Sequence, residues 1–191
     1  VEDTPIHIHT TATNKNNGTK TVPAGSDAVI TDNVEYSGLS TGKTYTFVGV
    51  LMTNDGKALE IDGKPVTTSK TFTTDRPNGS LDVEFSVNTT GLEGKTLTVF
   101  EYLYEGEDAK YGDDTYIALH DDISDVNQTV SVVDVHTTAL GDGSNEHIAK
   151  AAEKVVINDT VKYRGLTVGE TYDVVGKLMT VDADGKEVAV L

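Results

Sequence analysis

Hydrophobic and polar positions alternate along most of the chain, in short runs separated by polar, glycine-containing segments. The first clear run places Ile6, Ile8, Thr10 and Ala12 on one face of a strand, and histidine and threonine on the other face. Because Thr10 shares its face with apolar side chains, the alternation predicts that Thr10 points towards a core.

Further alternating runs predict strands over residues 28–36, 44–52, 70–73, 81–87, 96–104 and 116–120. A last strand would place Val126, Gln128, Val130 and Val132 on one face. Asn-Gly and Asp-Gly turn signals lie between these runs, and few segments have helical periodicity. This pattern is typical of an all-β antiparallel sandwich or barrel.

Two carboxylic side chains interrupt apolar faces. Asp32 shares a strand face with Ile30. Burying a carboxylate costs free energy unless it has a partner. A non-functional interpretation is also open, in which Asp32 lies near a strand end and its side chain stays hydrated. Glu101 shares a face with Val99, but the opposite face, which includes Phe100, is aromatic and is an alternative buried face that would leave Glu101 outside.

The chain contains an internal repeat. Residues 8–53 align without a gap with residues 135–180, at an offset of 127 positions, and 20 of the 46 aligned positions are identical. The identical pairs include Thr10 with Thr137 and Asp32 with Asp159. We therefore predict one complete unit over 1–132 and the N-terminal part of a second unit over 133–191, with almost no linker.

The second unit ends before the positions that would correspond to Glu101, His120 and Gln128. We expect it to be an incomplete sandwich with unpaired edges, prone to disorder or to pairing with another chain that carries a copy of the unit. The chain starts on Val1 without a signal peptide, and we expect it to be an interior fragment of a longer protein.

Composition and charge exclude several functions. The formal net charge of −16 argues against binding to nucleic acid or to an anionic membrane surface. There is no cysteine, so no disulfide holds the fold. Asp113 and Asp114 offer carboxylates to Ca²⁺, but without the spacing of an EF-type loop, and the His7/His9 pair is more simply an exposed face than a metal site. No cofactor is predicted.

The core-facing polar residues suggest one reaction. A sheet fold can bring the first and last strands together, and the Thr10 hydroxyl could then attack the Gln128 carboxamide, release ammonia and leave an ester. The reaction needs a proton acceptor and a proton donor. Asp32, Glu101 and His120 lie between the two reacting residues in the sequence and are the groups that could serve.

The chain resembles the Thr–Gln ester-bond domains, which are tandem repeats in the stalks of Gram-positive surface adhesins. The motifs that carry this resemblance are Ile8-His9-Thr10-x-Ala12, Asp32-x-Val34-x-Tyr36-x-Gly38-Leu39, Gly49-x-Leu51-Met52, Val99-Phe100-Glu101-x-Leu103-Tyr104, and His120 eight residues before Gln128. The resemblance spans 6–132 and the available part of 133–191.

The resemblance implies an Ig-like β-sandwich in which Thr10 is esterified to Gln128, with assistance from Asp32, Glu101 and His120. It also implies an extracellular, cell-wall-anchored structural protein, with no enzymatic turnover. The partners would be neighbouring repeats of the same stalk, and another domain of the parent protein would bind the host ligand. Thr11 stays open as an alternative nucleophile.

Three other functions compete with this interpretation. A Lys–Asn isopeptide bond would need a core-facing lysine, for which Lys70 and Lys95 are the candidates. A multiple-turnover hydrolase is permitted by the histidines and carboxylates, but no Gly-x-Ser-x-Gly or His-Glu-x-x-His motif occurs. A plain carbohydrate-binding or adhesive module would use a tyrosine platform drawn from Tyr36, Tyr45, Tyr102, Tyr104, Tyr111 and Tyr116.

Overall fold

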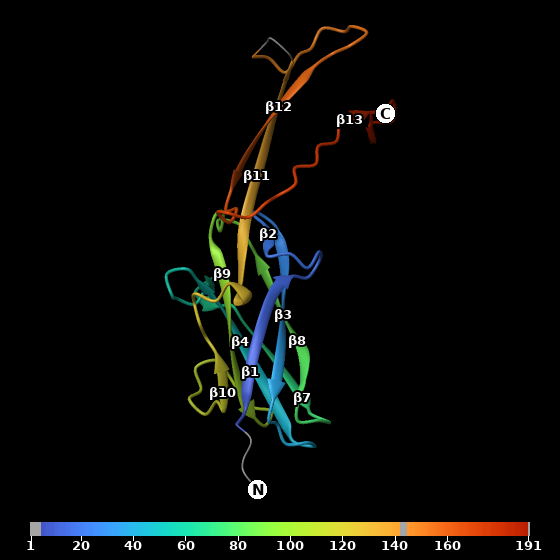
Figure 1. Ribbon diagram of the computed structural model, residues 1–191. Coiled ribbons are helices and arrows are strands. Elements are labelled where there is room, and N and C mark those ends of the chain that lie inside the picture. The colour runs from blue at the N-terminus through green and yellow to red at the C-terminus, as the bar shows by residue number, and fades with distance from the viewer. Residues whose placement is uncertain (1–4, 142–144, 191) are drawn as a thin grey trace.

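The computed structural model describes residues 5–141 and 145–190, and almost all of its regular structure is β (Figure 1). One 3-10 helix, η1 (Val126–Gln128), precedes the strand that leaves the first unit. The strands of the first unit are β1 (His7–Asn14), β2 (Thr21–Pro23), β3 (Asp27–Ser37), β4 (Thr44–Thr53), β5 (Glu60–Ile61), β6 (Lys64–Pro65), β7 (Thr67–Thr73), β8 (Gly79–Asn88), β9 (Thr96–Glu105), β10 (Ala118–His120) and β11 (Thr129–Gly141).

The first unit is an Ig-like sandwich of two sheets. One sheet has the order β1-β3-β8, and the other contains β11-β9-β4-β7, with β10 added at β9 and β2 added at β11. This is the strand arrangement of an Ig-like domain. The all-β fold class is confirmed. The sheets are antiparallel, except that β2 pairs with β11 in parallel.

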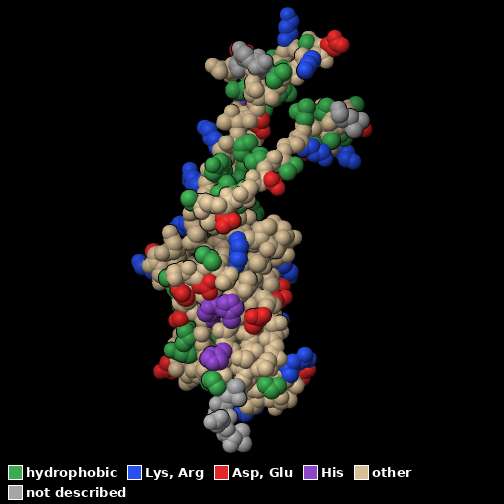
Figure 2. All heavy atoms as spheres, viewed as in Figure 1, with side chains coloured by type: hydrophobic (Ala, Val, Ile, Leu, Met, Phe, Trp, Pro, Cys, Tyr) green, Lys and Arg blue, Asp and Glu red, His purple; other side chains and the backbone are tan. Residues whose placement is uncertain are grey.

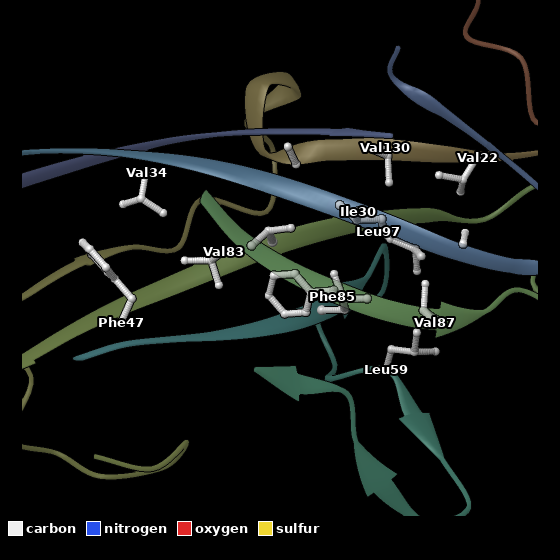
Figure 3. Packing of buried hydrophobic residues seen from close by; sticks show 14 of the residues in the cluster. Val22, Ile30, Val34, Phe47, Leu59, Val83, Phe85, Val87, Leu97 and Val130 are labelled. Carbon is white, nitrogen blue, oxygen red and sulfur yellow. The ribbon is translucent and has the colours of Figure 1, made fainter. Parts of the chain in front are cut away.

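The core lies between the two sheets and is built by the alternation that the sequence shows. Ile30 and Val34 on β3 and Leu97 on β9 are fully buried, and they pack with Phe85 and Val130 (Figure 3). The buried positions of β1 and β3 are the even-numbered ones, so the same periodicity that buries Ile30 also turns polar residues of these strands inward. The parity prediction for the first strand is confirmed.

The predicted last strand is wrong at its start. Residues 126–128 form η1, and Val126 is 76 % exposed instead of sharing the buried face with Gln128. The Asp125 side chain caps this helix by accepting a hydrogen bond from the Asn127 backbone N–H at 2.8 Å. Gln128 nevertheless points inward, because it is the last residue of η1 and directly precedes β11.

The two units share one strand. β11 continues from the first unit, where it pairs with β9 and β2, into the second, where it pairs with β12 (Ile157–Arg164) (Figure 1). The β11–β12 ladder repeats the register of the β1–β3 ladder: Thr137 lies opposite Val161, as Thr10 lies opposite Val34. The repeated sequence therefore forms the same hairpin-like pair in both units.

The rest of the second unit is sparser. The segment equivalent to β4 contributes only β13 (Met179–Val181), which pairs with β14 (Glu187–Ala189). In the first unit β4 lies between β9 and β7, and the described part of the second unit contains no counterparts of those two strands. Hydrophobic side chains consequently lie on the surface of this region (Figure 2).

Within the described residues, no helix has the length and apolar character needed to span a bilayer.

Candidate functional site

The structure gathers the five predicted site residues of the first unit from five different elements. Thr10 lies on β1, Asp32 on β3, Glu101 on β9, His120 on β10 and Gln128 in η1. All of them except His120 have 0 % exposure. His120 is partly buried, and histidine side chains gather on one surface of this unit (Figure 2).

Strand register explains how these residues meet. Ala12 lies opposite Asp32 in the β1–β3 ladder, so Thr10 and Asp32 are diagonal neighbours on the inner face. His120 lies directly opposite Glu101 in the β9–β10 ladder. η1 packs against both β1 and β9, which brings Gln128 to the same place.

His120 is positioned to accept a proton from Thr10. Its Nδ1 accepts a hydrogen bond from the Thr10 backbone N–H at 3.1 Å and lies 3.3 Å from the Thr10 hydroxyl oxygen. Nδ1 therefore carries the lone pair, and the proton of the neutral ring is on Nε2. Burial lowers the pKa of His120, and the nearby His9 lowers it further. The neutral imidazole is the form that acts as a base.

Asp125 lies beside His120 and is not among the residues that the sequence predicts for the site. Its Oδ2 lies 3.3 Å from His120 Nε2, the ring nitrogen that carries the proton. A carboxylate in this position fixes the tautomer and the orientation of the ring and stabilises the imidazolium that forms on protonation. The signal available in the sequence was its position between His120 and Gln128, five residues after the one and three before the other.

The Gln128 carboxamide is held by its nitrogen. Nε2 donates to the backbone carbonyl oxygens of Val99 at 2.7 Å and His120 at 2.8 Å. Among the described residues the Oε1 atom is buried without a hydrogen-bond partner. A buried carbonyl oxygen without a donor is rare, and it is the atom on which negative charge would develop during attack on this carboxamide.

The two carboxyl groups are also buried, and no hydrogen-bond partner for them occurs in the described part of the chain. Burial raises the pKa of Asp32 to about 7. The nearby Thr10 hydroxyl and the positive charge of Lys20 each lower this pKa, but by less than burial raises it. The Thr10 hydroxyl does not meet normal hydrogen-bond geometry with the carboxyl group. Burial raises the pKa of Glu101 well above its ordinary value, and the charge of Asp32 adds to the effect. Near neutral pH the pair therefore retains a proton in the core.

Gly49 makes room for Glu101. It lies opposite Glu101 in the β4–β9 ladder, and a Cβ there would come within 2.9 Å of Glu101 Cδ and 2.5 Å of the Phe85 ring. Glycine therefore allows the carboxyl group to turn into the site. The sequence interpretation quoted Gly49 as part of a family motif but did not assign this role to it.

A metal could in principle use His9, His120 and Asp125, whose ligand atoms lie within 4.8 Å of one another. The chemistry of His120 does not fit this. Its Nδ1 already accepts from the Thr10 N–H, and its Nε2, which carries the ring proton in this tautomer, lies 3.3 Å from Asp125 Oδ2. In this tautomer His120 has no free lone pair for a metal, and its contacts with Thr10 and Asp125 account for the cluster. Asp113 and Asp114 are not part of any metal-ligand group that the described residues form.

The burial of individual side chains distinguishes between the alternative nucleophile, the isopeptide lysines and the tyrosine platform. Thr11 lies on the outer side of β1 and is only partly buried, whereas Thr10 is fully buried. Lys70 and Lys95 are both exposed, so neither faces the core as an isopeptide would require. Of the six tyrosines, Tyr36, Tyr45 and Tyr104 are buried, Tyr102 is partly buried, and Tyr111 and Tyr116 are 40 % and 42 % exposed.

The second unit repeats the strand pairing of the first unit, but its corresponding side chains are not buried. Ala139 lies opposite Asp159, as Ala12 lies opposite Asp32. Thr137 and Asp159 are nevertheless both exposed. The described part of this unit contains no counterpart of the β9, β10 and η1 elements that cover the first site.

Solved structures with the same fold include a bacterial adhesin from Mobiluncus mulieris that contains intramolecular disulfide, isopeptide and ester bond cross-links. One structure of it superposes with a TM-score of 0.56 and 14 % identity over 85 % of this chain and 75 % of that one. A second crystal form gives a TM-score of 0.56 and 15 % identity over the same shares. At this identity the likeness establishes the fold alone. No curated protein matches the chain significantly.

The family comparison covers almost the whole sequence. The family model of the T-Q ester bond containing domain matches twice, over residues 6–132 and over residues 133–190. In the first match, the threonine and glutamine that could form such a bond are Thr10 and Gln128, which the strand geometry buries in one site. The chain belongs to the T-Q ester bond containing domain family.

Proposed function

We propose that the first unit is a structural domain that cross-links itself through an ester between Thr10 and Gln128. The observation that carries this proposal is the contact between the Thr10 hydroxyl and His120 Nδ1 at 3.3 Å, next to η1, in which the Gln128 carboxamide is buried with its oxygen unpaired. A nucleophile, a base and an electrophile thus share a site that excludes water.

The reaction balances within the site. His120 Nδ1 takes the Thr10 hydroxyl proton as the oxygen forms a bond to the Gln128 carboxamide carbon. The protonated member of the Asp32–Glu101 pair would donate a hydrogen bond to the developing oxyanion. The C–N bond then breaks, and the proton held by His120 passes to the leaving nitrogen, so that ammonia leaves and an ester remains.

This chemistry happens once per molecule and does not make the chain an enzyme. The exclusion of water that permits attack also protects the ester from hydrolysis. Together with the Mobiluncus mulieris adhesin, which is described as containing ester bond cross-links, this supports a role on the cell surface. We place the chain in the stalk of a cell-wall-anchored adhesin of a Gram-positive bacterium, where neighbouring repeats are its partners and another domain binds the host ligand.

A stalk gains mechanical resistance from a bond at this place. β1 is the first strand of the unit and β11, which follows Gln128, is the last, so pulling force enters and leaves next to the cross-link. The enclosed chain of more than a hundred residues cannot extend, which withholds roughly 400 Å at about 3.4 Å per residue. By analogy with disulfides, closing a loop of this size stabilises the fold by about 4–5 kcal/mol.

The second unit has the nucleophile position but lacks an enclosing site in the described residues. We propose that a further segment, from the same protein or from another chain, completes it by pairing with the open edge of the β11–β12 ladder. The exposed Val135 and Tyr163, which lie opposite each other in this ladder, would then be covered.

Intact-mass spectrometry of the full chain tests the ester. The wild-type chain should be one ammonia lighter than its sequence, and Thr10→Ala and Gln128→Ala should each have the unmodified mass. Thr11→Ala is the matched control and should still lose ammonia, because Thr11 points outward. An ester is cleaved by mild base, unlike an isopeptide, and peptide mapping should join Thr10 to Gln128. A wild-type chain of full mass would overturn the proposal.

A further inference from the structure

Lys20 joins the two elements that carry the reacting residues. Its Nζ donates to the backbone carbonyl oxygen of Ala12, two residues after Thr10 on β1, at 2.6 Å. The same Nζ donates to the carbonyl oxygen of Asn127, directly before Gln128 in η1, at 2.6 Å. One ammonium group therefore ties the strand of the nucleophile to the helix of the electrophile.

The backbone of Lys20 is anchored as well. Its carbonyl oxygen accepts a hydrogen bond from the Ser131 N–H on β11 at 2.8 Å. The side chain is partly buried, and its charge acts on Asp32 and Asp125, the carboxyl groups on either side of the reaction site. Lys20 is therefore held at its backbone and at its ammonium group, and its side chain forms a fixed bridge between β1 and η1.

The second unit repeats half of this arrangement. The residue 127 positions after Lys20 is His147, and its Nδ1 lies 2.9 Å from the carbonyl oxygen of Ala139, the counterpart of Ala12. Since a carbonyl oxygen only accepts, the histidine ring donates. A different basic residue thus makes the same contact in a unit where no η1 counterpart is described. This contact is therefore a feature of the repeat and is not peculiar to one loop.

We propose that Lys20 is a positioning residue for ester formation, which clamps β1 to η1 so that the Thr10 hydroxyl and the Gln128 carboxamide stay in reacting geometry. This role rests on the proposed ester chemistry. Lys20 touches neither reacting group; it acts through the backbone on either side of them. Small displacements of reacting groups are costly, and about 1 Å can reduce a rate about 100-fold.

The test measures the rate of ammonia loss in the full chain. The chain is made in a short cell-free synthesis pulse, samples are quenched in denaturing acid, and intact mass gives the ester fraction against time. Lys20→Met, which matches the apolar stem of lysine but lacks the terminal ammonium donor, should form the ester about 10- to 100-fold more slowly. Lys20→Arg can reach both carbonyls and should stay within about threefold of wild type.

Two controls separate positioning from folding. Lys15→Met removes a nearby lysine that pairs with Glu84 on the surface, and it should leave the rate unchanged. Thr10→Ala with and without Lys20→Met, neither of which can react, should show the same cooperative thermal unfolding if the fold does not need Lys20. If Lys20→Met does not fold, Lys20→Gln takes its place, because glutamine keeps one amide donor group. Its rate of ester formation should lie between that of wild type and the rate expected for Lys20→Met.

The outcomes are distinct. A folded Lys20→Met chain that reacts at the wild-type rate would overturn the positioning role, as would a folded Lys20→Arg chain as slow as Lys20→Met. Unfolding of both Lys20→Met and Lys20→Gln would assign Lys20 to the fold instead. In each of these cases the wild-type chain still loses ammonia. A wild-type chain that keeps its ammonia contradicts the ester itself.

Discussion

The most informative residues are the buried polar ones that the fold leaves without partners. Asp32, Glu101 and the oxygen of Gln128 are in the core and have no hydrogen bond from the described residues. Each such group costs on the order of 1–3 kcal/mol. In the proposed reaction, attack on Gln128 would give the carboxyl groups an oxyanion to bind, so the fold would hold this cost in store for ester formation.

Gly49→Ala should stop or strongly slow cross-linking. The added methyl group would overlap the Glu101 carboxyl and the Phe85 ring, so one of them must move. We expect at least about a 100-fold loss in the rate of ester formation, because displaced groups of this kind are costly. The measurement is intact mass against time, as for Lys20. Gly56→Ala is a control for a glycine with open space around it, although its positive φ adds local strain. Normal cross-linking of Gly49→Ala would show that Glu101 is not needed in its present place.

Asp32 should make the stability of the uncross-linked chain depend on pH. Its pKa rises from 3.8 to about 7 on folding, so between these values the folded state holds a proton that the unfolded state has lost. This contribution is fully present below about pH 4 and is lost as pH rises through about 7. Asparagine stays neutral at every pH, so Asp32→Asn should abolish this loss of stability at higher pH.

The comparison uses urea unfolding of Gln128→Ala with and without Asp32→Asn, at about pH 4 and about pH 8. The free energy of unfolding of the Asn variant is compared with that of its parent at each pH. This difference should shift in favour of the Asn variant, by on the order of 3 kcal/mol, between the lower and the higher pH. His120 is present in both chains, so its own titration cancels to first order. Equal pH dependence in the two chains would mean that Asp32 is not protonated in the fold.

At the scale of elements, the ester would join an edge strand to the end of the sandwich. β1 pairs only with β3 in its sheet, and its inner face contacts η1, β10 and β11. Edge strands open more easily than central ones because fewer hydrogen bonds hold them. The proposed cross-link would therefore protect an edge strand, the kind of element that opens most easily.

Hydrogen exchange should reveal this protection. In Gln128→Ala, the β1 amides should exchange about tenfold or more faster than in the wild-type chain, because the edge strand opens locally. β7 is the edge strand of the other sheet and carries no cross-link, so its amides provide the internal control. Equal acceleration of β1 and β7 would point to a global loss of stability instead of local opening.

At the scale of the molecule, the two units meet at a tight glycine contact. The Val132 carbonyl oxygen accepts a hydrogen bond from the Gly94 N–H at 3.0 Å, and Gly165 of the second unit lies against the same carbonyl. A Cβ on Gly165 would come within 3.1 Å of Gly94 Cα. The repeat places Gly38 against the Pro5 backbone in the same way at the start of the first unit. Close backbone approach makes this a stiff joint.

Gly165→Ala should loosen that joint. The methyl group would push the second unit away from the Val132 carbonyl, and NMR relaxation should then report more independent tumbling of the two units. Gly169→Ala is the matched control: its φ of +92° is as unfavourable for alanine as the +87° of Gly165, but nothing lies within 4 Å of its Cβ. A joint that loosens equally in both variants would trace the effect to backbone strain and not to contact.

Local periodicity explains what the sequence alone determined. A strand has a period of two, so the alternation around Thr10 was enough to place its side chain with the core, and it put Asp32 among apolar neighbours; the repeat identified the counterparts Thr137 and Asp159. The same rule failed at Val126, because a 3-10 turn has a different period and its cap, Asp125, looked like an ordinary loop residue.

Only the tertiary structure decided which of these residues meet. The inner face of Glu101 was ambiguous until both sheets were in place, since both sides of β9 carry apolar neighbours. Asp125, Gly49 and Lys20 act on residues far away in the sequence, at the ring of His120, the carboxyl of Glu101 and the carbonyls of Ala12 and Asn127. Contacts of this kind depend on sheet register and packing, which a periodic pattern along one chain does not contain.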